Sequence, residues 1–343
     1  MYRGIHGRGS ARVNAVNVLV TGGTGLVGSQ LIEALLEKGH PPDTIRALVR
    51  PRSHIDFLKE RDVRLYTGDL LDVDSLKAAT DGVDIVYHCA GAVDEKRREA
   101  FWEVNVIGTE RMLEAARWAG VPRFVYVSSI GVYGLLETTP ATEDHPTRPL
   151  RPYAVSKLAA EQRVRAYAQR YGLSSVILRP TAIVGRRDRT ITKRLVHLVR
   201  RRIVPMVGGG RARVSFVHAR DVAEAMILAG QSQRAAGKVY NVEGFSAPLR
   251  EVVQFFIDEV GSGATIIDVP YGLAFAGALI IDGIYAVARR HVHPIRARIG
   301  LRQLTRDLIF DTTKIRMDLG FQPRYGMEES FRQAIRWQLQ HGG

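Results

Sequence analysis

The stretch VNVLVTGGTGLVG, residues 16–28, decides the fold of this chain. Its first five residues are mostly apolar and β-branched, which predicts a short buried strand. The glycines follow at once, and a helix with an apolar stripe is expected over residues 29–38, ended by Gly39. Unpaired N–H groups and the helix dipole favour an anion at the start of such a helix. This strand–turn–helix unit therefore predicts a site for a dinucleotide pyrophosphate.

The glycine spacing is Gly22-x-x-Gly25-x-x-Gly28, which differs from the G-x-G-x-x-G of the plain dinucleotide fingerprint. Glycine permits a tight turn and the close approach of backbone to phosphate oxygens. An ordinary glycine-rich turn is the alternative, but the strand before it and the helix after it favour the dinucleotide site.

A second predicted strand, residues 44–49, ends at Arg50, and Arg52 and Ser53 follow. At this point of dinucleotide-binding folds an acidic residue binds the ribose hydroxyls, whereas an arginine can accommodate a 2′-phosphate. Here the acid is absent. The sequence therefore favours NADP(H), with NAD(H) as second choice and a solvated arginine pair as the alternative interpretation.

The composition is typical of a soluble globular protein, with 45% hydrophobic and 24% charged residues among 343. A single cysteine, Cys89, excludes an intrachain disulfide framework and fits a reducing cytoplasm. We expect it to be a small buried apolar residue. Residues 1–14 contain no apolar segment of a secretory signal, so we expect a flexible lead-in and a cytoplasmic protein.

The net charge is +14, and arginines crowd two stretches, residues 186–213 and 289–306. Such charge attracts nucleic acid, anionic lipid or a phosphorylated substrate. The sequence contains no evident nucleic-acid-binding module, and its aromatic residues are not interleaved with the basic runs. Nucleic-acid binding is therefore not expected.

Strand and helix signals alternate from residue 16 to about residue 185, which predicts an α/β fold with a doubly wound parallel sheet of the Rossmann type. The apolar strands predict a sheet covered on both faces. The predicted strands are residues 16–20, 45–49, 63–66, 85–88, 124–127 and 176–178, and the clearest helices are residues 100–119 and 154–171.

After Gly185 the alternation is less regular. The expected elements there are helices over residues 190–202, 221–230 and 327–339, and strands over residues 214–218 and 238–243. We predict a Rossmann domain over residues 15–185 with about 214–243. A smaller, interleaved substrate-binding domain would take residues 186–213 and 244–343.

An apolar stretch, residues 271–288, approaches the length of a membrane span but contains Asp282 and three glycines. Arg289 and Arg290 follow it. Either the stretch is a helix that lines the substrate pocket, or it is a membrane-surface helix whose basic neighbours meet anionic head groups. The second interpretation predicts peripheral membrane contact through residues 271–298.

Tyr153 and Lys157 are four residues apart at the start of a predicted helix, so both project from one face. An ammonium near a phenol favours the phenolate and lowers the tyrosine pKa from its ordinary value of about 10. Tyr153 is then a candidate general acid or base. A tyrosine and a lysine at this spacing occur often by chance. The catalytic interpretation is favoured because a glycine loop precedes them, and because Ser128 and Ser129 lie at the end of a predicted strand.

With these residues in place, the chain resembles the extended short-chain dehydrogenases/reductases, the NAD-dependent epimerase/dehydratase superfamily, over nearly its full length. The matching segments are residues 21–28, 68–70, 88–91, 105–109, 128–134, 153–157, 179–181 and 216–218. The resemblance implies hydride transfer at a nicotinamide cofactor, without a metal ion.

The resemblance also implies individual roles. Ser129 would hydrogen-bond the substrate oxygen, Tyr153 would exchange its proton, and Lys157 would bind the nicotinamide ribose. Asn105 would be the fourth catalytic residue, with bridging of backbone groups as the alternative. The cofactor-binding residues would be Gly22, Thr24, Gly25, Leu26, Val27, Gly28, Arg50, Arg52, Ser53, Asp69, Leu70, Ala90, Gly91, Tyr153, Lys157, Pro180, Thr181 and Ile183.

The C-terminal residues 306–323 resemble the 3β-hydroxysteroid dehydrogenase branch, whereas Arg50 resembles the NADP site of dihydroflavonol reductases. The implied activity interconverts a secondary alcohol and a ketone on a bulky apolar, sterol- or polycycle-like substrate. The helices at residues 100–119 and 154–171 correspond to those that pair between subunits in the family, which implies a homodimer.

Two other functions stay open. A nucleotide-sugar epimerase or dehydratase shares the constellation, and Arg211 and Arg213 beside Gly208–Gly210 could hold a diphosphate. The apolar stretch 271–288 argues against a purely polar ligand. The other alternative is a non-catalytic NADP-binding module, but such relatives tend to lose the tyrosine or the lysine, and this chain keeps both.

Overall fold

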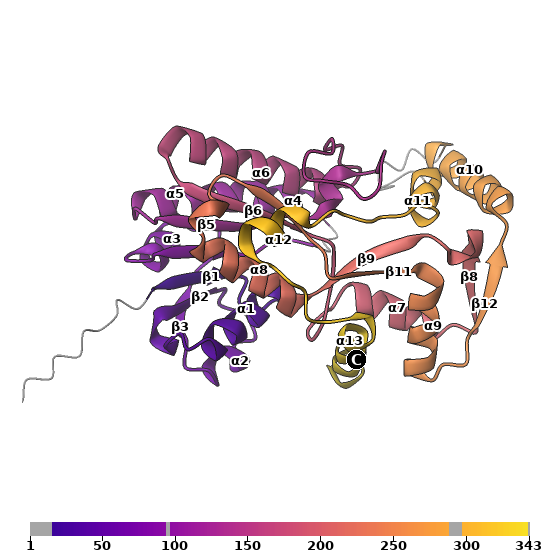
Figure 1. Ribbon diagram of the computed structural model, residues 1–343, viewed down its shortest axis with the longest axis horizontal. Helices are drawn as coiled ribbons and strands as arrows, with labels where there is room; N and C mark the ends of the chain where they lie inside the picture. The colour runs from indigo at the N-terminus through magenta and orange to yellow at the C-terminus, as the bar shows by residue number, and fades with distance from the viewer. Residues whose placement is uncertain (1–15, 94–96, 288–296, 342–343) are drawn as a thin grey trace, which may run out of the picture.

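A computed structural model describes residues 16–93, 97–287 and 297–341 (Figure 1). The expected lead-in at residues 1–14 lies outside the described residues, as do residues 288–296 of the predicted membrane-contact stretch.

A seven-stranded sheet forms the centre of the larger part of the molecule, in the order β10-β6-β5-β4-β1-β2-β3 with every neighbouring pair parallel. Its strands are β1 (Val18–Thr21), β2 (Ile45–Val49), β3 (Arg64–Thr67), β4 (Ile85–His88), β5 (Arg123–Val127), β6 (Ser174–Pro180) and β10 (Val239–Val242). The order reverses between β1 and β4, which is the switch point where open α/β sheets bind ligands. The predicted doubly wound α/β fold is confirmed.

Helices cover both faces of this sheet, as its apolar strands require (Figure 1). One face packs against α1 (Leu26–Glu37), α2 (Asp56–Lys59), α8 (Ala219–Gln231) and α12 (Thr313–Leu319), which contribute buried residues to one core. The other face packs against α3 (Val73–Thr80), α5 (Gly108–Trp118) and α6 (Pro152–Tyr171), which contribute to a second core.

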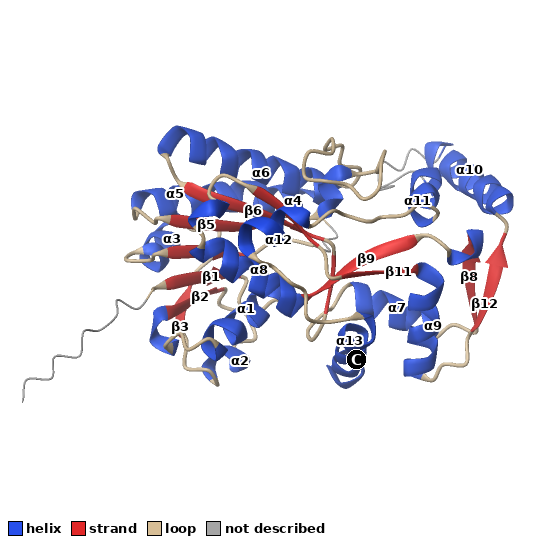
Figure 2. Ribbon diagram, in the orientation of Figure 1, coloured by secondary structure: helices blue, strands red, loops and turns tan. Residues whose placement is uncertain are grey.

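A second group of elements follows β6 and holds two smaller sheets, seen beside the central sheet in Figure 2. β7 (Ala182–Val184), β9 (Arg213–His218) and β11 (Phe245–Pro248) form one, and β8 (Ile203–Val207) pairs with β12 (Thr265–Val269) in the other. The helices of this group are α7 (Ile191–Val199), α9 (Leu249–Val260), α10 (Tyr271–Val287), α11 (Ala297–Leu304) and α13 (Met327–His341). A third core joins α7, α9 and α13 around Phe331.

Two predicted helices differ from the structure. The helix expected over residues 100–119 is divided into α4 (Arg98–Trp102), a π-helical turn at Glu103–Ile107 and α5. The helix expected over residues 190–202 ends at Val199, and the chain then enters β8. The remaining short helices are 3₁₀ turns at Pro42–Thr44, Ile130–Tyr133, Gly208–Gly210 and Gln233–Ala235.

The apolar stretch predicted at residues 271–288 is the helix α10, and several of its side chains are solvent-exposed, including those of Leu273 and Ile280. Among the described residues, no helix has both the length and the apolarity needed to cross a bilayer.

Candidate active site

The site lies at the edge of the central sheet where the parallel strands end. The glycine loop follows β1, residues 89–91 follow β4, Ser128 and Ser129 follow β5, and Pro180 ends β6. Because parallel strands present their carboxyl ends at the same edge, segments far apart in the sequence meet there.

The glycine loop is packed so closely that two of its glycines have no room for a side chain. A Cβ on Gly28 would lie 2.3 Å from the Gly22 carbonyl oxygen. Gly22 itself has φ of +72°, and a Cβ on it would lie 2.8 Å from the Ala90 nitrogen. The loop is therefore wedged between the start of α1 and the segment that follows β4, with Thr24 and Gly25 exposed.

The N-terminus of α1 fits an anion. No side chain caps this helix, and its first turn carries no acidic residue. The N–H groups of Leu26 and Val27 at its first turn therefore point, with the positive end of the helix dipole, toward the exposed loop residues. These residues fit the pyrophosphate of a dinucleotide, and their binding of it stays a prediction.

The expected adenosine end of the site is basic. Arg50 and Arg52 are exposed after β2, in a turn closed by a hydrogen bond from Ser53 N to the Arg50 carbonyl at 3.0 Å. Within the described part of the chain, neither guanidinium has an ion-pair partner. Asp69 accepts a hydrogen bond from Leu71 N at 2.9 Å through Oδ1, and Leu70 beside it is buried.

Ser129 and Tyr153 are brought together by the end of β5 and the first turn of α6. The Ser129 hydroxyl acts on the Tyr153 phenol, and it accepts a hydrogen bond from Gly131 N at 3.1 Å. Burial raises the pKa of the Tyr153 phenol to about 12, against the lowering effect of Ser129. The phenol is therefore protonated at neutral pH.

Lys157 is buried one helical turn from Tyr153. Its Nζ lies 4.3 Å from the centre of the Tyr126 ring, and a Cβ on Gly91 would lie 3.8 Å from it. Burial lowers the pKa of Lys157 to about 7, while Glu161 and Cys89 oppose this shift. The expectation that Lys157 lowers the Tyr153 pKa is not met, because burial of the phenol dominates.

Asn105 lies in the π-helical turn, and its side chain is fully engaged. Its Oδ1 accepts from Ala92 N at 2.7 Å, and its Nδ2 donates to the Ala92 carbonyl at 3.0 Å and to Ser156 Oγ at 2.9 Å. The structure thus shows the backbone-bridging arrangement given above as the alternative, so Asn105 fastens the segment after β4 to α6.

A buried chain of hydrogen bonds, which the sequence analysis missed, connects the glycine loop to Asn105. Thr21 Oγ1 lies 2.8 Å from His88 Nδ1, and His88 Nε2 lies 3.0 Å from Thr109 Oγ1. Thr109 donates its only hydroxyl proton to the Asn105 carbonyl at 2.7 Å. His88 must then carry its proton on Nε2, and Thr21 must donate to Nδ1. Burial lowers the pKa of His88 to about 3, so the ring is neutral.

A second buried network of hydrogen bonds, which the sequence did not predict, is centred on Glu161, one helical turn after Lys157. The Glu161 carboxylate accepts hydrogen bonds from the Ser128 hydroxyl at 2.5 Å and from the Arg179 guanidinium. Arg179 also donates to the Tyr133 hydroxyl at 2.9 Å, which in turn donates to Asn241 Oδ1 at 2.7 Å. The only sequence signal was the position of Glu161, four residues after Lys157 on the same helix face.

The end of β6 supplies the remaining predicted cofactor residues. Pro180 and Thr181 are buried, Ile183 is half-buried, and Thr181 N donates to the Val242 carbonyl at 3.0 Å. The Thr181 hydroxyl is buried without a hydrogen-bond partner. Since unpaired buried polar groups are costly, it fits a polar group of a bound nicotinamide.

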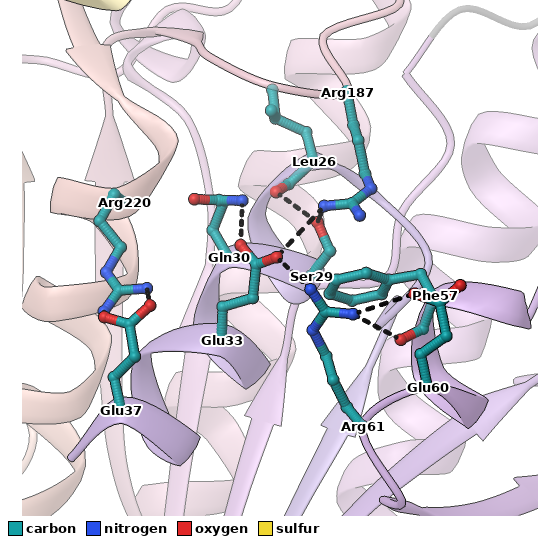
Figure 3. A network of polar contacts seen from close by, with 10 residues as sticks. All are labelled: Leu26, Ser29, Gln30, Glu33, Glu37, Phe57, Glu60, Arg61, Arg187 and Arg220. Atoms are coloured by element: carbon teal, nitrogen blue, oxygen red, sulfur yellow. Dashed lines mark hydrogen bonds and ion pairs between the residues drawn. The ribbon is translucent and has the colours of Figure 1, made fainter. Parts of the chain in front are cut away.

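The outer side of α1 is tied to the segment after β7, as Figure 3 shows. The Arg187 guanidinium lies 3.8 Å from the centre of the Phe57 ring, 3.4 Å from Ser29 Oγ and 3.9 Å from the Glu33 carboxylate. Arg61 contacts the same ring at 4.0 Å and pairs with Glu33 at 3.1 Å. Arg187 and Arg61 thus tie α1 to the segment after β7 and to the segment around α2.

A family model described as the NAD dependent epimerase/dehydratase family matches residues 18–242. The chain belongs to this family. It is therefore an NAD-dependent oxidoreductase of the extended short-chain dehydrogenase/reductase type. Among the described residues, no group of three or more His, Cys, Asp or Glu side chains could hold a metal ion.

Relatives in the NAD dependent epimerase/dehydratase family include a 2-alkyl-3-oxoalkanoate reductase from Stenotrophomonas maltophilia, 31% identical over 92% of this chain and 98% of the relative. A 4-hydroxy-2-methyl-3-oxo-4-farnesyl-3,4-dihydroquinoline-1-oxide ketoreductase from Stigmatella aurantiaca is 30% identical over 90% of this chain and 92% of the relative. The dTDP-glucose 4,6-dehydratase of Streptomyces venezuelae, solved with NAD bound, is 26% identical with a TM-score of 0.75, covering 95% of this chain and 98% of that one.

Proposed function

We propose that the protein interconverts a secondary alcohol and a ketone on a bulky apolar substrate, with Tyr153 as the general acid or base. The observation that carries the proposal is that the Ser129 hydroxyl acts on the Tyr153 phenol, with Lys157 one turn away at the edge of the sheet where the parallel strands end. A site that only bound a dinucleotide would not need a phenol and a hydroxyl placed together in this way.

In the reductive direction, the Ser129 hydroxyl hydrogen-bonds the ketone oxygen and Tyr153 donates its phenolic proton to that oxygen as the alcohol forms. A bound nicotinamide supplies or accepts the hydride. Because burial raises the pKa of Tyr153 to about 12, the phenol carries at neutral pH the proton that this step donates. Lys157 then binds the nicotinamide ribose, and its ammonium stabilises the negative charge left on the phenol oxygen.

We further propose NADP(H) as the preferred cofactor, because Arg50 and Arg52 stand where an acidic residue would favour NAD(H). An apolar substrate is supported by two relatives, which carry alkyl or farnesyl groups in the names of their substrates. Both are named as reductases.

A nucleotide-sugar epimerase or dehydratase is the second candidate, favoured by the likeness to a dTDP-glucose 4,6-dehydratase. Arg213 was a candidate for binding a diphosphate. Its Nη2 instead donates a hydrogen bond to the Ser246 carbonyl at 2.6 Å, so this group is less available to bind a phosphate. No acidic residue neighbours Ser129 in sequence, whereas dehydratases usually pair an acid with this position.

The test is a substrate panel with NADPH and NADH, read by nicotinamide absorbance. It contains long-chain 3-oxo esters, polycyclic ketones and nucleotide sugars. Reduction of an apolar ketone with NADPH is expected. Turnover of nucleotide sugars alone would contradict the proposal, and cofactor binding without any turnover would indicate the non-catalytic module.

Two partner interactions remain predictions. The exposed side chains of Trp102, Trp118 and Tyr171 lie on the helices expected to pair in a homodimer, which sedimentation analysis can test. The exposed apolar side chains of α10 suit a membrane surface, which co-sedimentation with anionic vesicles at low salt can test.

A further inference from the structure

The segment that follows β4 is held at two points by side chains from other elements. Thr21, the last residue of β1, accepts a hydrogen bond from Ala90 N at 3.1 Å. Asn105 binds both backbone polar groups of Ala92, accepting from its N–H at 2.7 Å and donating to its carbonyl at 3.0 Å. The segment is therefore clamped on both sides of Gly91, by a Thr21 clamp and an Asn105 clamp.

One buried side chain, that of His88, connects the two clamps. Its Nδ1 lies 2.8 Å from Thr21 Oγ1, and its Nε2 lies 3.0 Å from Thr109 Oγ1. Thr109 in turn donates to the Asn105 carbonyl at 2.7 Å. All four of these residues are at most 1% exposed. Together with the backbone of the clamped segment, these hydrogen bonds form a closed ring.

The ring is attached to the helical turn that carries Tyr153. Asn105 Nδ2 also donates to Ser156 Oγ at 2.9 Å, and the Ser156 hydroxyl donates to the Tyr153 carbonyl at 2.7 Å. A Cβ on Gly91 would lie 3.1 Å from Asn105 Oδ1 and 3.8 Å from Lys157 Nζ. The proposed proton donor and the proposed ribose-binding lysine are therefore both neighbours of the ring.

The His88 imidazole can make this connection because it is neutral. Burial, and then the charge of Lys157, lower the pKa of His88 to about 3. A neutral imidazole donates from one nitrogen and accepts at the other, so it can accept from Thr21 and donate to Thr109 at the same time. A protonated ring would donate from both nitrogens, and the Thr21 hydroxyl would then lose the acceptor of its own proton.

We propose that His88 is a positioning residue for the reaction: by joining the Thr21 and Asn105 clamps, it fixes the segment after β4 in relation to Tyr153 and Lys157. This rests on the proposed function, because Tyr153 is taken there as the group that transfers the proton. His88 is fully buried, so it acts through these residues and not by contact with a substrate. A displacement of about 1 Å at a reacting group can lower a rate about 100-fold, so the effect falls on the chemical step.

The kinetic test removes one hydroxyl from the ring and keeps the shape of the side chain. Thr109→Val leaves the His88 Nε2–H group and the Asn105 carbonyl without their partner. In single-turnover reduction of a ketone by bound NADPH, its rate should fall by about 10- to 100-fold, with the affinity for NADPH within about threefold of wild type. Thr109→Ser keeps the hydroxyl and should restore the rate to within about threefold of wild type.

Thr80→Val is the matched control. Thr80 is also buried, and its hydroxyl donates to the Leu76 carbonyl at 2.9 Å within α3, outside the ring. This variant loses a buried hydroxyl as well, but it should reduce the ketone at the wild-type rate. A purely structural role of Thr109 would lower the stability of both valine variants and leave both rates unchanged.

Two NMR measurements do not depend on turnover. At pH 7 the ¹⁵N shifts of the His88 ring in the wild type should show a neutral imidazole with its proton on Nε2. The Ala92 amide, which Asn105 binds, should exchange with solvent about 10-fold faster in Thr109→Val than in Thr80→Val, the value of one weakened hydrogen bond. If the wild type reduces no ketone while both NMR results hold, the proposed function fails and the connection through His88 stands.

Three results would overturn the inference. The first is reduction at the wild-type rate by a folded Thr109→Val. The second is an equal loss of rate in Thr109→Ser or in Thr80→Val, because the hydroxyl of Thr109 would then not be the cause. The third needs no variant: a wild-type His88 ring with its proton on Nδ1. Thr109 would then donate to His88 in place of the Asn105 carbonyl, and the ring would not be closed.

Discussion

Arg179 holds Glu161 in a two-point ion pair, with Nη2 2.6 Å from Oε2 and Nε 2.9 Å from Oε1. Both side chains are almost completely buried, at 3% and 1% exposure. The carboxylate also accepts a hydrogen bond from the Ser128 hydroxyl, and Glu161 lies one turn after Lys157 on α6. A buried ion pair therefore lies one helical turn from the proposed catalytic lysine, and its Glu161 carboxylate raises the pKa of Lys157.

Glu161→Gln should move the alkaline limb of the pH–kcat profile to lower pH. Burial lowers the pKa of Lys157 to about 7, and the Glu161 carboxylate opposes this. Without the Glu161 carboxylate the pKa of Lys157 falls further, so Lys157 loses its ammonium form at a lower pH. Glu259→Gln, which removes the carboxylate from the half-exposed pair with Arg332, is the control and should leave the profile in place.

The same substitution should cost about 3–5 kcal/mol in unfolding free energy, since it leaves a buried guanidinium unpaired. Urea unfolding measures this cost. The double variant Glu161→Gln/Arg179→Met removes both charges and should be more stable than Glu161→Gln alone, with the profile still shifted. An unshifted profile in a folded double variant would rule out the effect of Glu161 on Lys157.

His88 should make the protein less stable in acid. Its pKa falls from 6.5 to about 3 on folding because the ring is buried, so below pH 6.5 the unfolded chain binds a proton that the folded protein does not. Between pH 7 and pH 5 this single residue should lower the unfolding free energy by about 2 kcal/mol. His88→Gln removes that part of the pH dependence, and urea unfolding at the two pH values measures it. An NMR titration in which His88 gains a proton near pH 6.5 would disprove the neutral buried ring.

Arg50→Asp should reverse the cofactor preference. The substitution removes the cation proposed for the 2′-phosphate and supplies the acid that binds ribose hydroxyls. We expect the ratio of kcat/KM for NADPH to that for NADH to fall by about 10- to 100-fold, with Arg200→Asp as the control. A wild-type KM lower for NADH than for NADPH would already contradict the NADP assignment.

Arg187→Ala should lower the unfolding free energy by about 1–3 kcal/mol, because it removes the stacking on Phe57 and the contacts with Ser29 and Glu33 shown in Figure 3. Arg187 has φ of +75°, a conformation that costs a non-glycine residue about 1–2 kcal/mol. Arg187→Gly should therefore be the more stable of the two variants. Arg186→Ala, at the exposed neighbour, should change stability by less than about 0.5 kcal/mol.

Local patterns made most of the central sheet predictable. The glycine loop, the alternation of strands and helices, and the spacing of Tyr153 and Lys157 are properties of short segments, and each indicates its element without tertiary information. The strands β7, β8, β11 and β12 were not predicted. They are three to five residues long, and their pairing depends on partners far along the chain.

The buried networks could not be predicted for a related reason. His88 and Thr109 meet only because β4 ends beside the π-helical turn, and nothing in the run around His88 indicates that turn. The pKa of Tyr153 was predicted with the wrong sign, because the sequence shows the nearby lysine but not the extent to which the phenol is buried. Burial is a property of the whole fold.

The most direct test of the central proposal is a single-turnover measurement on Tyr153→Phe. Loaded with NADPH and mixed with a ketone that the wild type reduces, this variant should show a loss of at least about 100-fold in the rate of nicotinamide oxidation, the contribution of a general acid. Its affinity for NADPH should remain within about threefold of wild type, because Lys157 and the glycine loop are untouched. Reduction of the ketone at the wild-type rate by a variant that still binds NADPH would contradict the assignment of Tyr153 as the proton donor.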